Sequence, residues 1–556
     1  MLGAVFAFLA LASLATTASV VRADSANSSA DGGGCAEASS NATANSTSAS
    51  ASADPACSFF SGNIFGDSES DFTGSATGNS QALDLGTSAD DSTCLSCTAA
   101  TSSAVAADEN SIGAGFGTSF AGLCLDCSAA AATSVAASDP GVALGAGVAV
   151  AGACLDCEAE AEVEAIAENA SIVIAAGIAA GAACTDCEGD AFVNAVADEG
   201  SIAEAIGIAL AAACGDCNAV GTANVAATDA SIALSNTIAL AGGCNNCDAT
   251  GTSDVTADGG SFAIGTVLSG ALACDNCVSD ASADADATND GFASSTSVAL
   301  SAACDSCESE SIATSSADDK SDATATALGL SGVCGNCTSS ANANAVAIDQ
   351  SEVIATAIAV AAVCDKCAAT ADADAIGDDP AAAVATAVGL AAVCEDCEGH
   401  ATALAESTLA SSANATSIAA GVLCENCVAT TDATATGTNK SDATALTLGL
   451  AGVCENCEVV TDSTATATDK SNALDANIGL ALVCTNCETH TTSNAEATDK
   501  SNAAGVTLAL SGVCTNCETH TNSDIDATNK SNSLGITVGG ALLCTNCEAH
   551  STQTVE

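Results

Sequence analysis

The chain has 556 residues, and its 69 Asp and Glu residues against seven Lys and Arg give a formal net charge of −62. This charge excludes nucleic acid as a partner, because binding to phosphates requires Lys and Arg. Trp and Tyr are absent, so the core must consist of small and aliphatic side chains, which predicts a thin, long core rather than a thick globular one.

The N-terminus has the pattern of a secretory signal peptide, which we assign to residues 1–23. Residues 1–18 are almost wholly apolar, and small residues suitable for cleavage stand at Val21 and Ala23. Removal of this segment takes away one basic residue, Arg22, and no acidic one, so the net charge changes from −62 to −63. No other apolar run reaches the roughly 18 to 20 residues that span a bilayer. We therefore expect a secreted, extracellular protein without a membrane partner.

Two segments precede the regular part of the chain. Residues 24–56 are rich in Ser, Ala and Asn, a low-complexity composition that predicts a flexible arm. Residues 57–93 contain Phe59, Phe60, Phe65 and Phe72. We predict an N-terminal cap here, because terminal units of repeat proteins are usually atypical.

Residues 94–556 form a repeat domain. The pair Cys-x-x-Cys recurs with a 30-residue period from Cys94 to Cys544, without insertion or deletion. A fixed period of this length is the signature of a repeat architecture in which each unit stacks on the next.

The first half of each unit alternates strictly between small and polar residues, as in residues 158–165 with the sequence EAEAEVEA. A period of two predicts a half-buried strand with Ala inward and the carboxylates outward. A turn follows, as at Asp469-Lys470-Ser471, and its Ser recurs in 12 of the 15 full repeats.

The second half is more apolar and is also predicted to be a strand, with a helix as the alternative because Ala favours helices. Leu474, Ile478 and Leu480 share one face of this segment. The other face is small and flat. In one copy it consists of Ala473, Asn477, Gly479 and Ala481, and in another of Ala443, Ala445, Thr447, Gly449 and Ala451. We expect this small face to be able to pack against an identical one.

Two strands per unit predict an all-β fold, an elongated two-sheet β-solenoid of fifteen to sixteen 30-residue coils that is stapled by disulfides. An antiparallel meander of the same strands is the alternative.

The 34 cysteines predict disulfides, since an even number in a secreted chain favours oxidation. Local closure within each pair is one arrangement, and it leaves Cys35 to join Cys57. A ladder between coils, such as Cys427 with Cys454, is the second, and four-thiolate zinc sites between neighbouring pairs are the third. The local pairs are Cys94 and Cys97, Cys124 and Cys127, Cys154 and Cys157, Cys184 and Cys187, Cys214 and Cys217, Cys244 and Cys247, Cys274 and Cys277, Cys304 and Cys307, Cys334 and Cys337, Cys364 and Cys367, Cys394 and Cys397, Cys424 and Cys427, Cys454 and Cys457, Cys484 and Cys487, Cys514 and Cys517, and Cys544 and Cys547.

All four histidines occupy one repeat position, at His400, His490, His520 and His550. In a solenoid the last three would stack, and such a row could bind a transition metal. An exposed polar position without function is the alternative. Glycosylation sequons begin at Asn27, Asn41, Asn45, Asn169, Asn414, Asn439 and Asn529.

Stacked carboxylates such as Asp280, Asp284 and Asp286 would repel one another, and divalent cations would relieve the repulsion. No calcium-loop consensus is present, so we expect no cofactor beyond weakly bound calcium. Thr464, Thr466 and Thr468 alternate along one segment. Such arrays resemble those on the disulfide-linked solenoids of insect antifreeze proteins, and the resemblance covers only a few late repeats.

These features predict a secreted, non-enzymatic structural protein of an extracellular matrix, wall or coat. The alternative is a surface-binding protein whose flat faces bind ice, a mineral or divalent cations. Self-association is expected for the structural role. An enzyme is not expected, because the repeats lack the long loops with which polysaccharide-cleaving solenoids interrupt their coils.

Overall fold

The computed structural model describes the backbone of residues 25–555, except 32–34, 43–46, 55–56, 66–67, 77–80, 91–95, 108–111, 123–124, 320, 349–351, 379–381, 409–411, 500, 530–531 and 544. Side chains are described from residue 98 onward, with the same gaps. The described residues form strands and tight connections, and none of them lies in a helix. The helical alternative for the second half of the repeat is therefore wrong.

Six strands precede the regular coils: β1 (Ser25–Asp31), β2 (Cys35–Ala42), β3 (Thr47–Asp54), β4 (Cys57–Phe65), β5 (Ser68–Ala76) and β6 (Gln81–Asp90). The first halves of the repeats form β7 (Ser96–Ala107), β9 (Asp126–Ala137), β11 (Asp156–Ala167), β13 (Asp186–Ala197), β15 (Asp216–Ala227), β17 (Asn246–Ala257), β19 (Asn276–Ala287), β24 (Asp396–Ser407), β26 (Cys424–Gly437), β28 (Cys454–Ala467), β30 (Cys484–Ala497), β32 (Cys514–Ala527) and β34 (Glu548–Val555).

The second halves form β8 (Ile112–Gly122), β10 (Val142–Gly152), β12 (Ile172–Ala182), β14 (Ile202–Ala212), β16 (Ile232–Gly242), β18 (Phe262–Leu272), β23 (Ala382–Ala392), β25 (Ser412–Val422), β27 (Asp442–Ala451), β29 (Asn472–Ala481), β31 (Asn502–Ser511) and β33 (Asn532–Ala541). Three long strands, β20 (Phe292–Ala317), β21 (Asp322–Ile348) and β22 (Glu352–Asp378), run through the cysteine bend and contribute to both halves.

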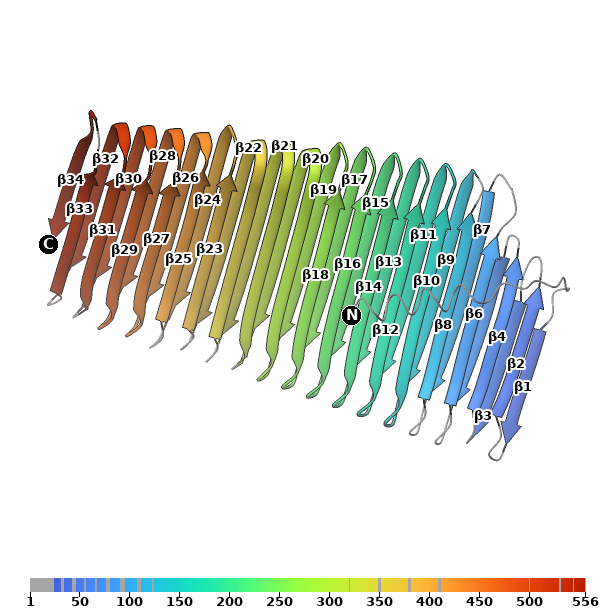
Figure 1. Ribbon diagram of the computed structural model, residues 1–556. Helices are drawn as coiled ribbons and strands as arrows, with labels where there is room; N and C mark the ends of the chain where they lie inside the picture. Colours follow the sequence, from blue (N-terminus) through green and yellow to red (C-terminus); the bar gives the residue numbers. More distant parts are fainter. Residues whose placement is uncertain are drawn as a thin grey trace.

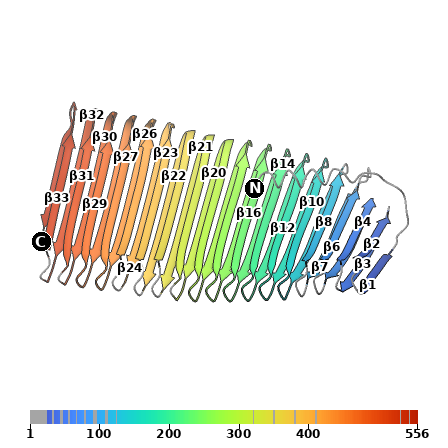
Figure 2. The same cartoon turned by 60° about the horizontal axis from the view of Figure 1, so that its bottom comes forward.

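The strands build a parallel β-solenoid, with one coil per repeat. Each strand pairs with its counterpart in the next repeat, so that Glu158 lies opposite Glu188 and Ile172 opposite Ile202. The stack runs in a single direction from β1 to β34, and two layers of strands are visible along it (Figure 1; Figure 2). All of these pairings are parallel, which confirms the solenoid and excludes the meander.

The N-terminal strands join the same stack through coils of other lengths. Cys35 lies opposite Cys57 across a coil that is shorter than the regular repeat, whereas Gln81 lies opposite Ile112 across a slightly longer one. Strands β1 to β3 thus occur within the segment that we assigned to an arm, and β4 to β6 within the predicted cap. Their alternating small residues suit parallel pairing as the later repeats do. The predicted signal peptide, residues 1–23, lies outside the described residues.

The first-half strands place their side chains as the alternation predicted. On β11, Ala159, Ala161 and Ala165 have no exposed surface. Glu160 and Glu164, which alternate with them, are exposed. The inner face of this sheet therefore consists of very small side chains, and the two sheets can approach each other closely.

The second-half strands correct our expectation about their small face, which is turned into the core and does not form an outer surface. Ala473 and Ala481 are buried, whereas Leu474 on the opposite face is 44% exposed. A Cβ atom on Gly449 would lie 2.5 Å from a methyl group of Thr461 on the facing strand. The narrow space left by the inward alanines of the first half admits only small residues, so the larger aliphatic side chains point outward.

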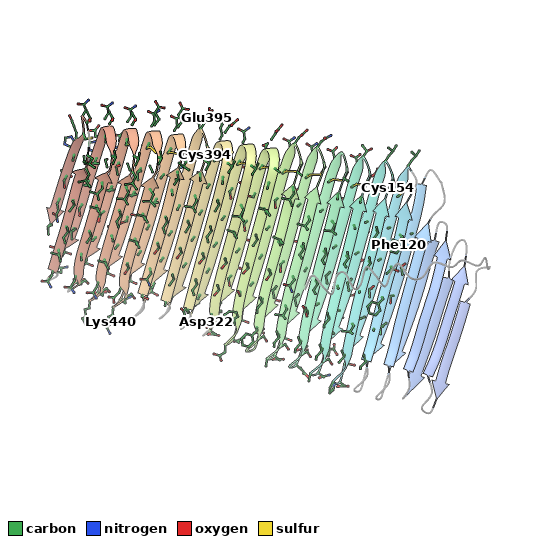
Figure 3. The ribbon with its side chains drawn as sticks, viewed as in Figure 1. Phe120, Cys154, Asp322, Cys394, Glu395 and Lys440 are labelled. Atoms are coloured by element: carbon green, nitrogen blue, oxygen red, sulfur yellow. A yellow bond between two sulfur atoms is a disulfide. The ribbon has the colours of Figure 1, made fainter. Side chains whose placement is uncertain are left out.

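Two edges join the sheets, and Figure 3 shows both, with Cys154 and Cys394 on one and Asp322 and Lys440 on the other. At the turn edge, Asp469 and Lys470 have φ angles of 55° and 68°. Both residues therefore have a left-handed backbone, as the two central residues of a tight turn of this type require. The recurrent Ser closes this edge. The Ser171 N–H donates to Ser201 Oγ at 3.1 Å, and the Ser201 N–H donates to Ser231 Oγ at 3.1 Å.

At the cysteine edge, the residue before the first Cys has a left-handed backbone in most of the described coils. Ala or Gly occupies this position in early coils, as at Ala213 and Gly243, but Val occupies it at Val333, Val363 and Val393, with φ near 60°. A β-branched residue is strained in this region. These valines remain 62, 50 and 46% exposed, so burial within the coil does not compensate for the strain.

We predict that Val363→Asn stabilises the folded chain by about 1 kcal/mol, because Asn tolerates the left-handed region far better than Val. Thermal unfolding followed by circular dichroism measures the effect. Val384→Asn serves as the control, since Val384 is a partly exposed strand residue whose φ is not left-handed. Equal or greater destabilisation by Val363→Asn than by the control would contradict the assignment of strain.

Candidate functional site

The outer surface of the first-half sheet is strongly acidic, and we call the outward residues of these strands the acidic face. Glu158 and Glu160 of β11 lie opposite Glu188 and Asp190 of β13. Carboxylates thus adjoin one another both along a strand and between coils. This arrangement concentrates negative charge on a flat array.

Burial and, to a smaller extent, repulsion between neighbouring carboxylates raise the pKa of several carboxyl groups on the acidic face. Burial raises the pKa of Asp190 to about 6, and repulsion from Glu188 and Glu160 adds to the rise. Burial likewise raises the pKa of Asp280 to about 6, with a further contribution from Asp248. Cations bound in front of the array would lower these pKa values again. The weak calcium binding that we expect would take place on this face as a charged surface, since the sequence contains no calcium-loop consensus.

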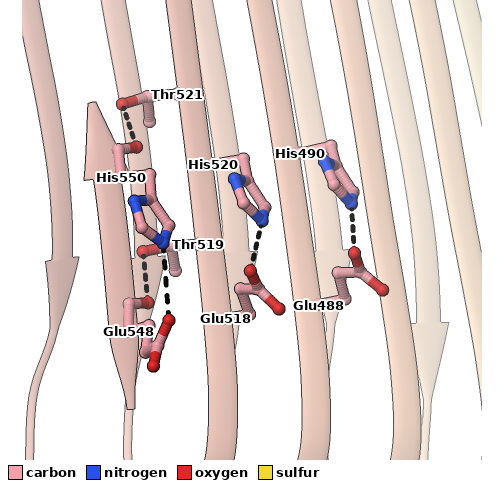
Figure 4. Close-up of polar contacts among 8 residues, drawn as sticks. All are labelled: Glu488, His490, Glu518, Thr519, His520, Thr521, Glu548 and His550. Carbon is pink, nitrogen blue, oxygen red and sulfur yellow. Dashed lines mark hydrogen bonds and ion pairs between the residues drawn. The ribbon is translucent and has the colours of Figure 1, made fainter. Parts of the chain in front are cut away.

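The histidine row is present as predicted, and each ring has a carboxylate partner (Figure 4). His490 and His520 stack with ring centroids 4.9 Å apart, and His520 and His550 with centroids 5.2 Å apart. The Nε2 atom of His490 lies 2.6 Å from an oxygen of Glu488, two residues earlier.

The other histidines repeat this contact. Nε2 lies 2.7 Å from Glu518 at His520 and 3.5 Å from Glu548 at His550, and His400 makes the same 2.7 Å contact with Glu398. Imidazole and carboxylate groups are suitable ligands for a transition metal. The Glu partners were missed by sequence reasoning, although the recurring Glu-x-His spacing contained the signal.

The cysteine pairs are closed locally. Twelve disulfides join Cys-x-x-Cys pairs in the described part of the chain, from Cys154 with Cys157 to Cys484 with Cys487. Sulfur atoms of neighbouring coils also lie close together, and those of Cys277, Cys304 and Cys307 are within 4.8 Å of one another. Since each of them is already bonded, a zinc site there would require reduction.

The last pairs differ from the prediction. Cys514, Cys517 and Cys547 are free thiols. Cys517 and Cys514 share a hydrogen bond, and burial raises the pKa of the Cys517 thiol far above its ordinary value. Cys94, Cys124 and Cys544 lie outside the described residues. The side chains of Cys35, Cys57 and Cys97 also lie outside them, although the backbones of Cys35 and Cys57 are paired.

The glycosylation candidates fall into two groups. Asn169, Asn439 and Asn529 lie in the turn edge with φ near 57°, where a glycan would project away from both sheets. Asn414 lies within β25 on the outer surface of the second-half sheet. Asn45 lies outside the described residues, and only the backbones of Asn27 and Asn41 are described.

Amide ladders run along both edges and were not predicted. At the cysteine edge, Asn456 Nδ2 donates to Asn426 Oδ1 at 3.0 Å, and Asn486 Nδ2 donates to Asn456 Oδ1 at 3.2 Å. At the turn edge, Asn502 Nδ2 donates to Asn472 Oδ1 at 2.7 Å. Stacked amides of this kind stabilise in-register parallel strands. Their signal was Asn recurring at two repeat positions, one for each edge.

One carboxylate lies inside the core. Asp475 has no exposed surface, and it accepts hydrogen bonds from the Ser463 and Ser493 hydroxyl groups on the facing sheet. Burial raises the pKa of Asp475 to about 8, against the opposing effect of hydrogen bonds from the Ser493 hydroxyl and the Asn494 backbone N–H. Asp475 is therefore mostly protonated and neutral at pH 7.

The comparisons with known proteins give no relative. No family model matches the chain, and neither a curated protein nor a solved structure matches it. Among the described residues, no helix is long and apolar enough to cross a membrane. The many disulfides are consistent with an extracellular protein.

We predict that Asp475→Asn removes part of the pH dependence of stability. The folded pKa of about 8 exceeds the unfolded value of about 4, so the wild-type chain loses stability as the pH rises between them, by at most about 1.4 kcal/mol per pH unit. The variant lacks this loss. The melting temperature of Asp475→Asn minus that of wild type should therefore increase from pH 4 to pH 8.

The exposed Asp462 supplies the control for this experiment, because Asp462→Asn removes a carboxylate from the outer surface of β28. The melting temperature of each variant minus that of wild type is compared over the same pH range. If this difference is the same for Asp475→Asn and Asp462→Asn at every pH, Asp475 is ionised in the folded chain and the prediction is wrong.

Proposed function

We propose that this chain is a secreted, non-enzymatic structural protein of an extracellular matrix, wall or coat. The observation that carries the proposal is the uninterrupted stack, in which each coil from residue 154 to residue 487 has its own disulfide and full parallel pairing to the next coil. Such an object resists local opening, because each coil is held by hydrogen bonds on two sides.

The acidic face adds hydration and cation attraction to this rigid body. Carboxylates are spread over many coils, from Glu158 on β11 to Asp524 on β32. A surface that attracts cations along its whole length suits a protein embedded in a hydrated, ion-containing layer. Calcium is the cation that we expect it to bind weakly.

No enclosed site competes with this assignment among the described residues. The hollow beside the cysteine bends is shallow and is lined by residues such as Asp275, Asp305 and Val333. Each of these residues repeats a position found in every coil, so the hollow is part of the regular edge. A specialised enzyme site would instead break the repeat.

The structural role predicts persistence that depends on the disulfides. Each local bridge closes a very short loop and is worth about 2 kcal/mol in the chain-entropy account. We expect the oxidised chain to survive protease treatment and heating that degrade the same chain after reduction and alkylation. Gel electrophoresis over time, with circular dichroism as a check on folding, measures this. Equal lifetimes for the two forms, or rapid loss of the oxidised one, would contradict the proposal.

Surface binding remains the second candidate, and a row of threonines favours it. Thr266, Thr296, Thr326, Thr356, Thr386 and Thr416 lie opposite one another in six successive coils on the outside of the second-half sheet. A flat row of methyl and hydroxyl groups at the coil spacing could bind an ordered solid such as ice. Thermal hysteresis that is lost in Thr326→Leu with Thr356→Leu would support this role, and freezing without hysteresis or crystal shaping would reject it.

A further inference from the structure

The outer surface of the second-half sheet is almost uncharged and mainly apolar, apart from polar residues such as the row of threonines that includes Thr326 and Thr356. We call the outward residues of β8 to β33 in this sheet the apolar face. One of its rows runs from Val148 through Ile178 to Val538, and every residue in that row is Val, Ile or Leu. Across the described outward positions of these strands the charged residues are Glu204, Asp322, Glu352 and Asp442.

This arrangement leaves the larger aliphatic side chains of the sheet outside the core. The core contains mainly Ala, Ser and a few Val, whereas Phe262, Leu474 and Leu534 are 51, 44 and 64% exposed. Burial of apolar surface stabilises in proportion to its area. Much of the stabilisation available to this sequence is therefore not realised within a single chain.

The area of the apolar face is larger than that of the apolar patches which monomeric soluble proteins expose. Strands of about ten residues and a stack of about fifteen coils give a plane of roughly 35 by 70 Å, or about 2400 Å². The largest apolar patch of a typical monomer covers about 300–600 Å². Two such faces in contact would bury more than a standard protein interface, which covers roughly 1600 Å² in total.

We propose that the apolar face is covered by a second copy of this chain, so that two solenoids pack face to face through their second-half sheets. The faces are flat and identical, as a twofold interface requires. In this arrangement both acidic faces point outward. They are then separated by two solenoid thicknesses, several times the Debye length of about 8 Å at physiological salt, so their repulsion opposes pairing only weakly.

The composition disfavours a lipid surface as the occupant. Proteins that lie on membranes use Trp and Tyr at the interface and Lys or Arg toward anionic headgroups. This chain has no Trp or Tyr and a net charge of −62. A second copy avoids both conflicts, because aliphatic side chains meet aliphatic side chains.

The valines at the cysteine edge add exposed apolar surface beside the apolar face. Val333, Val363 and Val483 keep left-handed backbones while half or more of their surface is exposed. Early coils show that Ala and Gly fit this position, as at Ala183 and Gly243. An apolar partner surface would supply the burial that these valines lack in one chain.

The proposal is tested by the mass of the full oxidised chain in solution, measured by sedimentation and light scattering over a range of concentrations. We expect the wild-type chain to have twice the monomer mass. Ile358→Glu with Ile418→Glu places two charges on the apolar face, because both residues point outward there. We expect this variant to weaken pairing by about tenfold or more, with an unchanged circular dichroism spectrum.

The matched control is Ile312→Glu with Ile376→Glu. These residues point outward on the acidic face, and the substitution changes the net charge equally. The control should remain dimeric. A wild-type chain that stays monomeric at the highest soluble concentration would overturn the proposal, as would equal loss of pairing in both variants. Binding of the monomer to zwitterionic lipid vesicles, or to ice, would identify a different occupant and also overturn it.

The protease resistance of the chain tests the structural role, and its mass in solution tests the interface, so the two proposals can fail separately. A chain that resists protease as a monomer retains the structural role but loses this interface. A protease-sensitive dimer retains the interface but loses the structural role.

Discussion

In-register parallel stacking of identical repeat positions is the constraint on which the rest of this structure depends. Because every regular coil has the same length, Cys157 lies opposite Cys187 and Ser295 opposite Ala325 without any slip. The same register stacks the turn serines, the Asn amides and the three histidine rings. A residue inserted within a strand would turn the side chains that follow it in that strand to the other face, whereas the N-terminal coils show that the connections tolerate other lengths.

The second constraint is the size of the inward side chains. Ala, Gly, Ser and Thr line both inner faces, and Ile525 is the largest fully buried side chain among the described residues. Sheets that approach over such residues leave no space for Leu or Ile between them. The aliphatic side chains are consequently displaced to the outer surface of one sheet, and the carboxylates to that of the other. The amphipathic character of the solenoid is thus a consequence of its thin core.

The sequence predicted the fold class, the strand halves and the turn edge, because strict alternation and a fixed period have few other solutions. The orientation of the second-half strands was predicted wrongly. Both of their faces are apolar, so the positions of Ile478 and Leu480 do not themselves identify the inner one. The inward alanines of the first half, such as Ala159, contained that information, since they set the distance between the sheets. The contacts of Asp475 with Ser463 and Ser493 depend on pairing across the core, which a linear pattern does not reveal.

The most direct test of the thin core compares two neighbouring residues of β22 that point in opposite directions. Ala355 has no exposed surface, and Thr356 points outward. In thermal unfolding, Ala355→Leu should destabilise the chain by about 1–3 kcal/mol or more, because the added side chain has no space. Thr356→Leu should leave the melting temperature nearly unchanged. The reverse order, with Leu tolerated at 355 and destabilising at 356, would contradict the account.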